Sequence, residues 1–232
     1  MHKGIIIAIS WPETLVVKEG KWYDMPMTFL GFVKNNYYKV GHAAMLLIDN
    51  ENGNVEYFDF GRYHTPLKMG RVRSVVTDPD LEITTRAQFD EYGGISNLEN
   101  ILLEVDTMPT SHGDGKALAS VLTEVDYNKA LNKINAIQQK GAVDYGPFAL
   151  KGTNCSRFVA QVSRHATNNW IVKTLLTIPY TVTPSPRSNI RVIKNTVGYY
   201  EVEEGNVLLK PAYLTTKIFR RKLPAFNFAR KN

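Results

Sequence analysis

The chain has 232 residues, of which 44% are hydrophobic, 11% aromatic and 22% charged. This balance excludes an intrinsically disordered chain, and the length suits one good-sized domain or two small ones. The 28 basic and 22 acidic residues give a formal charge of +6. That mild excess favours anionic partners such as cell-wall polymers, acidic lipid surfaces or nucleic acid.

A single cysteine excludes an intramolecular disulfide, which fits a reducing compartment. The N-terminal apolar run, Gly4–Ile9, is followed by Trp11-Pro12 and lacks the long core and the small-residue cleavage site of a signal peptide. No stretch reaches the roughly 20 apolar residues of a membrane span. We therefore expect a cytoplasmic protein without a transmembrane segment.

Strand-like runs fill the first half of the chain. We expect strands over Gly4–Ile9, Tyr37–Ile48, Val55–Phe60, Val72–Thr77 and Ile101–Asp106. Residues 49–54 separate the second run from the third, and they contain an Asn-Gly pair, the dipeptide typical of tight hairpins. The sequence therefore predicts a β-hairpin at this point.

Helical periodicity appears in the second half. Lys116–Val125 is predicted as one helix, and Asp126 is a candidate N-cap for a second helix that ends at Gly141. A third helix is predicted from about Asn154 to about His165.

The region after the third helix matches no motif. Prolines mark an irregular passage there, and short strands are predicted near Ile190–Val197 and Gly198–Val202. Because no linker separates this region, we expect one α+β domain over residues 1–232, with residues 167–232 as C-terminal elaborations.

Much of the positive charge lies in the C-terminal tail, between Lys217 and Lys231. Phe219, Phe226 and Phe228 punctuate this tail, as base stacking in a nucleic-acid binder would require. A basic tail is more often a solvated end, and no nucleic-acid motif is present, so nucleic acid is not an expected partner.

Cys155 is the candidate nucleophile. A thiol attacks as thiolate, so a catalytic cysteine needs a lowered pKa and a base within reach. With Thr153 or Asn154 as N-cap, Cys155 lies in the first helical turn, where unpaired N–H groups and the helix dipole favour an anion or an oxyanion. Arg157 adds positive charge nearby. The alternative is a buried core cysteine, since Phe158 shares its face.

The base must be one of five histidines. Three of them are unsuitable by position. His2 is terminal, and His112 lies in a Gly-rich loop. His165 lies ten residues beyond Cys155 on the same predicted helix, a distance of about 15 Å. His64 precedes Thr65-Pro66 and is predicted in a loop. His42 begins an apolar strand with small neighbours that leave room for a substrate or a helix. It is the candidate base. The alternative is a structural histidine on an edge strand, with its hydrogen bonds satisfied there.

These motifs together resemble a known family. A Gly41-His42-small-small-aliphatic strand, a hairpin and a late Asn154-Cys155-x-x-Phe-Val helix start are similar to the circularly permuted NlpC/P60 branch of papain-like cysteine hydrolases. That branch includes the lecithin:retinol acyltransferase-like and YiiX-like proteins, and its histidine precedes its cysteine. The match covers residues 38–60 and 145–164. The resemblance implies a permuted papain-like α+β fold, with an antiparallel sheet packed against helices.

The resemblance also implies a third polar residue on the second hairpin strand, which orients the histidine. Family members place this group after two apolar residues, which favours Asp59. Glu56, on the opposite face of the strand, is the reserve, and a surface ion pair is the alternative role for either. Tyr145, Asn154 and Ser156 are the candidates for the oxyanion or substrate-binding site, although Tyr145 also suits a core or rim position.

We therefore expect a thiol hydrolase that cleaves an amide bond, in a peptide or cell-wall peptide, through an acyl-enzyme on Cys155 with His42 as base. No cofactor or metal is expected, because paired ligand spacings such as Cys-x-x-Cys or His-Glu-x-x-His are missing. Two alternatives stay open. One is a lipid ester or amide hydrolase or acyltransferase on the same dyad, and the other is a non-catalytic ligand-binding module. The sequence leaves the oligomeric state unknown.

Overall fold

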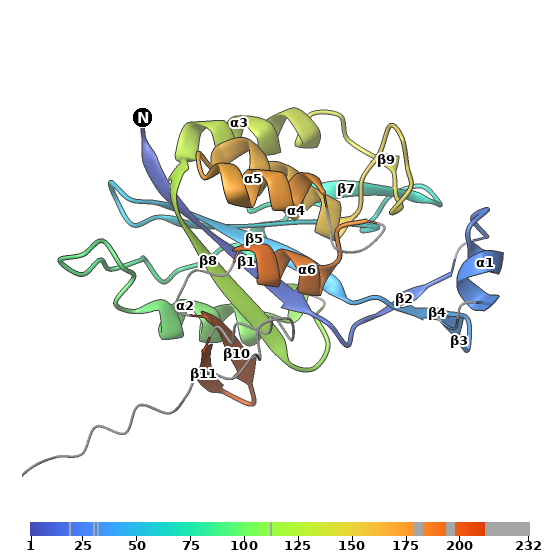
Figure 1. The fold of residues 1–232 in the computed structure, drawn as a ribbon, viewed down its shortest axis with the longest axis horizontal. Helices are drawn as coiled ribbons and strands as arrows, with labels where there is room; N and C mark the ends of the chain where they lie inside the picture. The colour runs from blue at the N-terminus through green and yellow to red at the C-terminus, as the bar shows by residue number, and fades with distance from the viewer. Residues whose placement is uncertain are drawn as a thin grey trace, which may run out of the picture.

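The computed structural model describes residues 1–211 except 19, 30, 32, 112, 179–182 and 194–197. Within them an eight-stranded sheet runs in the order β11-β10-β8-β1-β5-β6-β7-β9, and its neighbouring strands pair antiparallel (Figure 1). The strands are β1 (Lys3–Trp11), β5 (His42–Asp49), β6 (Val55–Gly61), β7 (Met69–Arg73), β8 (Ala117–Asp126), β9 (Val143–Asp144), β10 (Gly198–Glu203) and β11 (Asn206–Pro211). The helices are α1 (Asp24–Phe29), α2 (Leu98–Asp106), α3 (Tyr127–Gln138), α4 (Cys155–Ala166), α5 (Trp170–Thr177) and α6 (Pro186–Ile193). The prediction of an antiparallel sheet packed against helices is confirmed.

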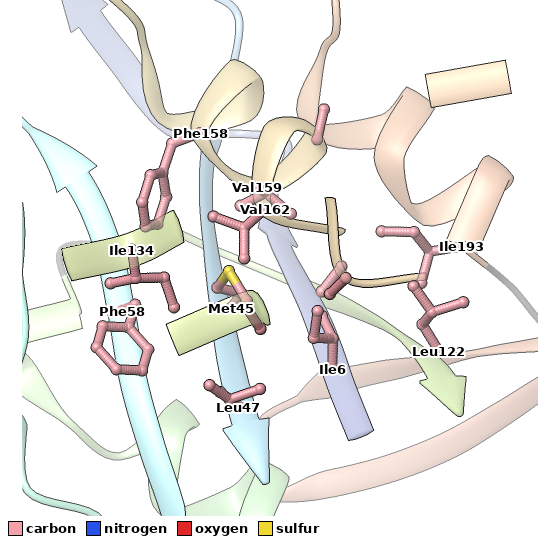
Figure 2. Close-up of a cluster of buried hydrophobic side chains, with 14 of the residues drawn as sticks. Ile6, Met45, Leu47, Phe58, Leu122, Ile134, Phe158, Val159, Val162 and Ile193 are labelled. Atoms are coloured by element: carbon pink, nitrogen blue, oxygen red, sulfur yellow. The ribbon is translucent and has the colours of Figure 1, made fainter. Parts of the chain in front are cut away.

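The central strands are buried on both faces. On one face, Ile6, Met45 and Phe58 pack against α3, α4 and α6 (Figure 2). On the other face, the alternate residues of β1 and β5 share a core with Ile101 and Val105 of α2. Side chains alternate along a strand, so both sets of positions must be apolar, and this explains the unbroken apolar runs of β1 and β5.

The hairpin prediction is confirmed. β5 and β6 pair antiparallel across the turn, from Ile48 opposite Val55 to Ala44 opposite Asp59. Gly53 in the turn has φ +73°, and a Cβ there would lie 2.4 Å from the Ala87 carbonyl oxygen. Glycine is required at this position for both reasons.

Two helix starts are also confirmed. The Asp126 side chain accepts a hydrogen bond from the Lys129 N–H at the start of α3, and the Asn154 side chain accepts one from the Arg157 N–H at the start of α4. Both are N-caps of the usual kind.

For two segments the predicted type of secondary structure was wrong. Lys116–Val125, predicted as a helix, forms β8, and Ile101–Asp106, predicted as a strand, lies within α2. β8 pairs with β1 and β10 and is buried along most of its length, so its apolar residues do not alternate cleanly. A short apolar run of this kind does not distinguish a buried strand from a buried helix.

Other boundaries differ. Gly41, with φ +77°, divides the predicted Tyr37–Ile48 strand into β4 (Tyr37–Lys39) and β5. The strand predicted at Val72–Thr77 ends at Arg73, and Ile190–Ile193 belongs to α6 rather than to a strand. The last four residues of that predicted strand lie outside the described ranges, as does the basic tail. The strand near Gly198–Val202 is confirmed as β10.

A second, three-stranded sheet is formed by β2 (Leu15–Val17), β3 (Val33–Lys34) and β4, in the order β2-β4-β3. Together with α1 it projects from one end of the main sheet (Figure 1). Among the described residues, no helix is both long and apolar enough to cross a membrane.

Candidate active site

Cys155 is the first residue of α4 and is buried. The Asn154 cap begins the helix at this point, so the thiol lies beside the N–H groups that have no partner within the helix. The Arg157 guanidinium does not pair with the thiol. It donates to the carbonyl oxygens of Gly146 and Ala149, at 3.1 and 2.8 Å, and so holds the loop that precedes the cysteine.

His42 is the first residue of β5 and is buried. Its ring stacks on Trp11, the last residue of β1, with centroids 5.8 Å apart. Nε2 lies 3.2 Å from Oδ2 of Asp59, and the imidazole lies near enough to the Cys155 thiol that each group shifts the pKa of the other. The order of contacts is therefore thiol, imidazole, carboxylate, which is the arrangement of a nucleophile, its base and an orienting group.

Asp59 is fully buried on β6 and is not in the surface pair considered as its alternative role. Besides His42 it accepts two hydrogen bonds from Arg73, from Nε to Oδ1 at 2.9 Å and from Nη2 to Oδ2 at 2.6 Å. The Tyr57 hydroxyl lies 3.3 Å from Oδ2. Arg73 also donates to the Thr110 carbonyl oxygen at 2.9 Å. The carboxylate is thus fixed from several sides.

The sequence analysis missed Arg73. It lies on β7, next to β6 in the sheet, and is directly opposite Asp59 in the strand register. Its guanidinium also covers the ring of Tyr63, with Cζ 3.5 Å from the centroid. The signal that could have found it is an arginine in the strand that follows the Asp59 strand.

The pKa values of the dyad shift in opposite directions. Burial works against the charged form of His42, but the hydrogen bonds to Asp59 and Cys155 raise the pKa of the imidazole to about 9. Burial also opposes the Cys155 thiolate, yet the bonds from His42, Ser156 and Tyr145 lower the pKa of the thiol. These directions favour a thiolate–imidazolium pair at neutral pH.

The pKa of Asp59 is lowered. Burial alone would raise it, and the hydrogen bonds from His42 and Arg73 outweigh the burial. Asp59 therefore stays ionised beside the imidazolium.

The reserve carboxylate is not part of this site. Glu56 is half-buried and accepts a hydrogen bond at 2.7 Å from the Tyr127 hydroxyl of α3. Strand alternation directs it to the opposite face from Asp59.

The three candidates for the oxyanion or substrate site all lie around the thiol. The Tyr145 hydroxyl is 3.9 Å from Cys155 Sγ and the Ser156 hydroxyl is 3.8 Å from it. Tyr145 also stacks on Phe60, so it has a packing role as well. Asn154 lines the cleft beside Cys155, and its side chain is engaged in the helix cap.

Cys155 opens onto a cleft of about 320 Å³. Its walls come from the β2–β4 region, the loop before α4 and the start of α6. Most of the lining side chains are aliphatic or aromatic: Val16, Val17, Tyr23, Met27, Tyr38, Val40, Tyr145, Pro147, Phe148, Pro184 and Pro186. Lys21 at its edge pairs with Asp144 at 2.5 Å, and Asp24 accepts a hydrogen bond from the Tyr38 hydroxyl.

The other described histidines lie elsewhere. His2 pairs with Asp49 at 2.7 Å, His64 is exposed in a loop, and His165 is in the last turn of α4. His112 lies outside the described residues. Of the histidines that the structure describes, His42 is the one that lowers the pKa of the thiol.

Comparison with known proteins gives one family and one similar fold. The model of the family described as type VI secretion system effector TseH-like matches residues 6–171. The crystal structure of the type VI secretion system effector TseH has a similar fold, with a TM-score of 0.54 and 19% sequence identity over 90% of this chain and 98% of that one. No curated protein matches. The structural likeness bears on the fold, and the family match extends over more than half of the chain.

Proposed function

This chain belongs to the TseH-like family of type VI secretion system effectors, and we propose that it is a thiol hydrolase that acts through Cys155. The observation that carries the proposal is the buried pair of His42 and Asp59 beside Cys155, a buried thiol whose pKa is lowered by His42. The thiol is also at the wall of a cleft, so a bound substrate would reach it.

The proposed reaction is acyl transfer to water. The Cys155 thiolate attacks a carbonyl carbon, and His42 gives its proton to the departing amine or alcohol. A water molecule then attacks the acyl-enzyme, His42 takes a proton from it, and the thiolate leaves. The first N–H groups of α4 and the Tyr145 hydroxyl are in position to stabilise the negative oxygen of each tetrahedral intermediate.

Asp59 has the orienting role in this proposal. It accepts from Nε2 of His42 and so keeps the other ring nitrogen towards the thiol. The chain order of a histidine strand, a carboxylate strand and a cysteine helix supports a permuted papain-like fold. We propose that residues 1–232 form a single domain of this kind.

A peptide or cell-wall peptide amide is the first substrate proposed. The cytoplasm would then be where the protein is made, and an effector of a secretion system would act after its export. One observation favours the second candidate, a lipid ester or amide: most side chains that wall the cleft are aliphatic or aromatic. Both substrates would use the same acyl-enzyme chemistry and need no cofactor.

The test is the pH dependence of Cys155 alkylation by iodoacetamide. In the wild type the rate should already be on a plateau near neutral pH, because the thiolate is stabilised by the imidazolium. In His42→Ala the rate should instead rise with an ordinary thiol pKa of about 8.5, so that at pH 6.5 it is lower by about tenfold or more.

His64→Ala is the matched control, because it removes an exposed loop histidine, and it should keep the wild-type profile. If wild type and His42→Ala share one unperturbed profile, the dyad is wrong and the ligand-binding module becomes the better account.

A further inference from the structure

Three separate chain segments meet at the end of the molecule that carries the cleft. They are α1 with the residues just before it, the hairpin loop between β6 and β7, and the loop after β9 (Figure 1). Lys21 donates to Asp144 and to the Lys68 carbonyl oxygen, and Lys68 donates to the Gly20 carbonyl oxygen. These bonds hold the bases of the three segments together.

Each segment presents large apolar side chains to solvent. Phe29 of α1 is 91% exposed, Leu67 of the hairpin loop 77% and Leu150 of the third segment 99%. Trp22 and Met25 add to the first segment, at 75% and 80%. Large apolar side chains exposed on neighbouring segments of a folded protein mark a surface that contacts something else.

The cleft ties this surface to the site. Lys21, Tyr23 and Phe148 line the Cys155 cleft, and they also line a second hollow of about 400 Å³ that Trp22 and Leu150 border. Two of the exposed apolar residues, Trp22 and Leu150, therefore border a hollow that shares part of its lining with the Cys155 cleft.

The charges of the three segments indicate which kind of partner this surface binds. Over residues 18–29, 62–68 and 144–151 the sequence has five basic residues, Lys18, Lys21, Arg62, Lys68 and Lys151, against three acidic ones, Glu19, Asp24 and Asp144. Asp24 is buried against Tyr38, and Asp144 is paired with Lys21. Apolar tips with a tryptophan, flanked by lysines, match the interface of an anionic lipid bilayer, where the apolar groups enter the acyl boundary and the lysines meet phosphate.

The shape of the surface agrees with this partner. The apolar side chains stand on separate segments rather than forming one flat, packed patch, which is what the core of a protein–protein interface needs. A fluid bilayer accommodates separate protrusions. We propose that this end of the molecule, defined by Trp22, Met25, Phe29, Leu67 and Leu150, docks on the surface of an anionic membrane.

The test is co-sedimentation of the full chain with lipid vesicles, of phosphatidylcholine alone or with about 30% phosphatidylglycerol. Wild type should bind the anionic vesicles more tightly than the neutral ones, with binding that weakens as salt is raised. The Phe29→Ser/Leu150→Ser variant should bind at least tenfold more weakly, and Lys151→Glu should weaken the preference for anionic lipid. These are exposed positions, and circular dichroism of each variant checks that it is folded.

Tyr92→Ser is the matched control. Tyr92 is 89% exposed and belongs to the segment before α2. That segment lies at the opposite side of the molecule from α1 (Figure 1). The variant should leave vesicle binding unchanged. The proposal is overturned if wild type stays in the supernatant, or if Tyr92→Ser weakens binding as much as the Phe29/Leu150 variant. It is also overturned if the wild type forms a dimer that Phe29→Ser dissolves while vesicles are not bound. Because no readout uses Cys155, these outcomes do not test the proposed hydrolase activity, which is tested separately by alkylation.

Discussion

The strand β7 carries two arginine–aspartate pairs that are chemically alike and differently surrounded. Arg73 binds Asp59 in the interior, where the two side chains are 4% and 0% exposed. Arg71 binds Asp78 through two bonds of 2.7 Å, with side chains 20% and 17% exposed. Water can replace a lost partner in the outer pair but not in the inner one. Burial, rather than the pair itself, should therefore decide how much each contributes.

Breaking the inner pair should give the largest effect. Arg73→Met removes the guanidinium that binds the buried Asp59 carboxylate and leaves only His42 as its charged partner, and breaking a buried pair costs about 3–5 kcal/mol. The measurement is the free energy of unfolding in urea. A loss no greater than that of Arg71→Met would show that the buried environment is not the deciding factor.

Asp59→Asn should have the next largest effect, on reactivity. The amide cannot stabilise the imidazolium as the carboxylate does, so Cys155 alkylation at pH 6.5 should slow by about tenfold. In Asp78→Asn, which changes the outer pair, Cys155 should be alkylated at the wild-type rate. A normal rate in folded Asp59→Asn would remove Asp59 from the proposed triad.

Both aspartates should also contribute to acid unfolding. The pKa of each is lowered in the folded state, in Asp59 by His42 and Arg73 against the effect of burial, and in Asp78 by Arg71 first. A lowered pKa contributes stability that is present above the unfolded value of about 3.9 and is lost as the pH falls through the folded value. The free energy of unfolding should therefore fall less steeply between about pH 5 and pH 3 in Asp59→Asn than in wild type. Asp78→Asn should flatten the slope as well, and a wild-type slope in either variant would contradict the lowered pKa of that aspartate.

Arg71→Met should give the smallest effect. A partly exposed pair contributes about 0–1 kcal/mol, so urea unfolding should change by no more than that, and the alkylation profile should not change. A loss of several kcal/mol would mean that the outer pair is more strongly desolvated than its exposure indicates.

The sequence predicted the parts of the site that depend on local signals. The cap at Asn154 and the start of α4 at Cys155 follow from neighbouring residues, and the Asn-Gly turn sets the β5–β6 register that brings His42 near Asp59. Resemblance to a family, rather than spacing, selected Asp59 over Glu56. The roles of these residues in catalysis stay predictions.

The parts that sequence did not predict depend on distant contacts. Arg73 meets Asp59 only because β7 lies next to β6, and nothing in its own neighbourhood marks it. β8 was mistaken for a helix because its two faces are covered by different parts of the chain. The three exposed apolar segments were missed because they adjoin only in the folded molecule.

The position of β1 has a consequence for the order in which the molecule assembles. It is the first strand of the chain, and it lies in the sheet between β5 and β8, with Gly4 opposite both Asp49 and Val125. The central ladder is therefore incomplete until β8 has been synthesised, and closing such long loops makes folding slow. Until then the apolar residues of β1 are exposed to other chains, so the nascent protein should depend on a chaperone or on rapid synthesis to avoid aggregation.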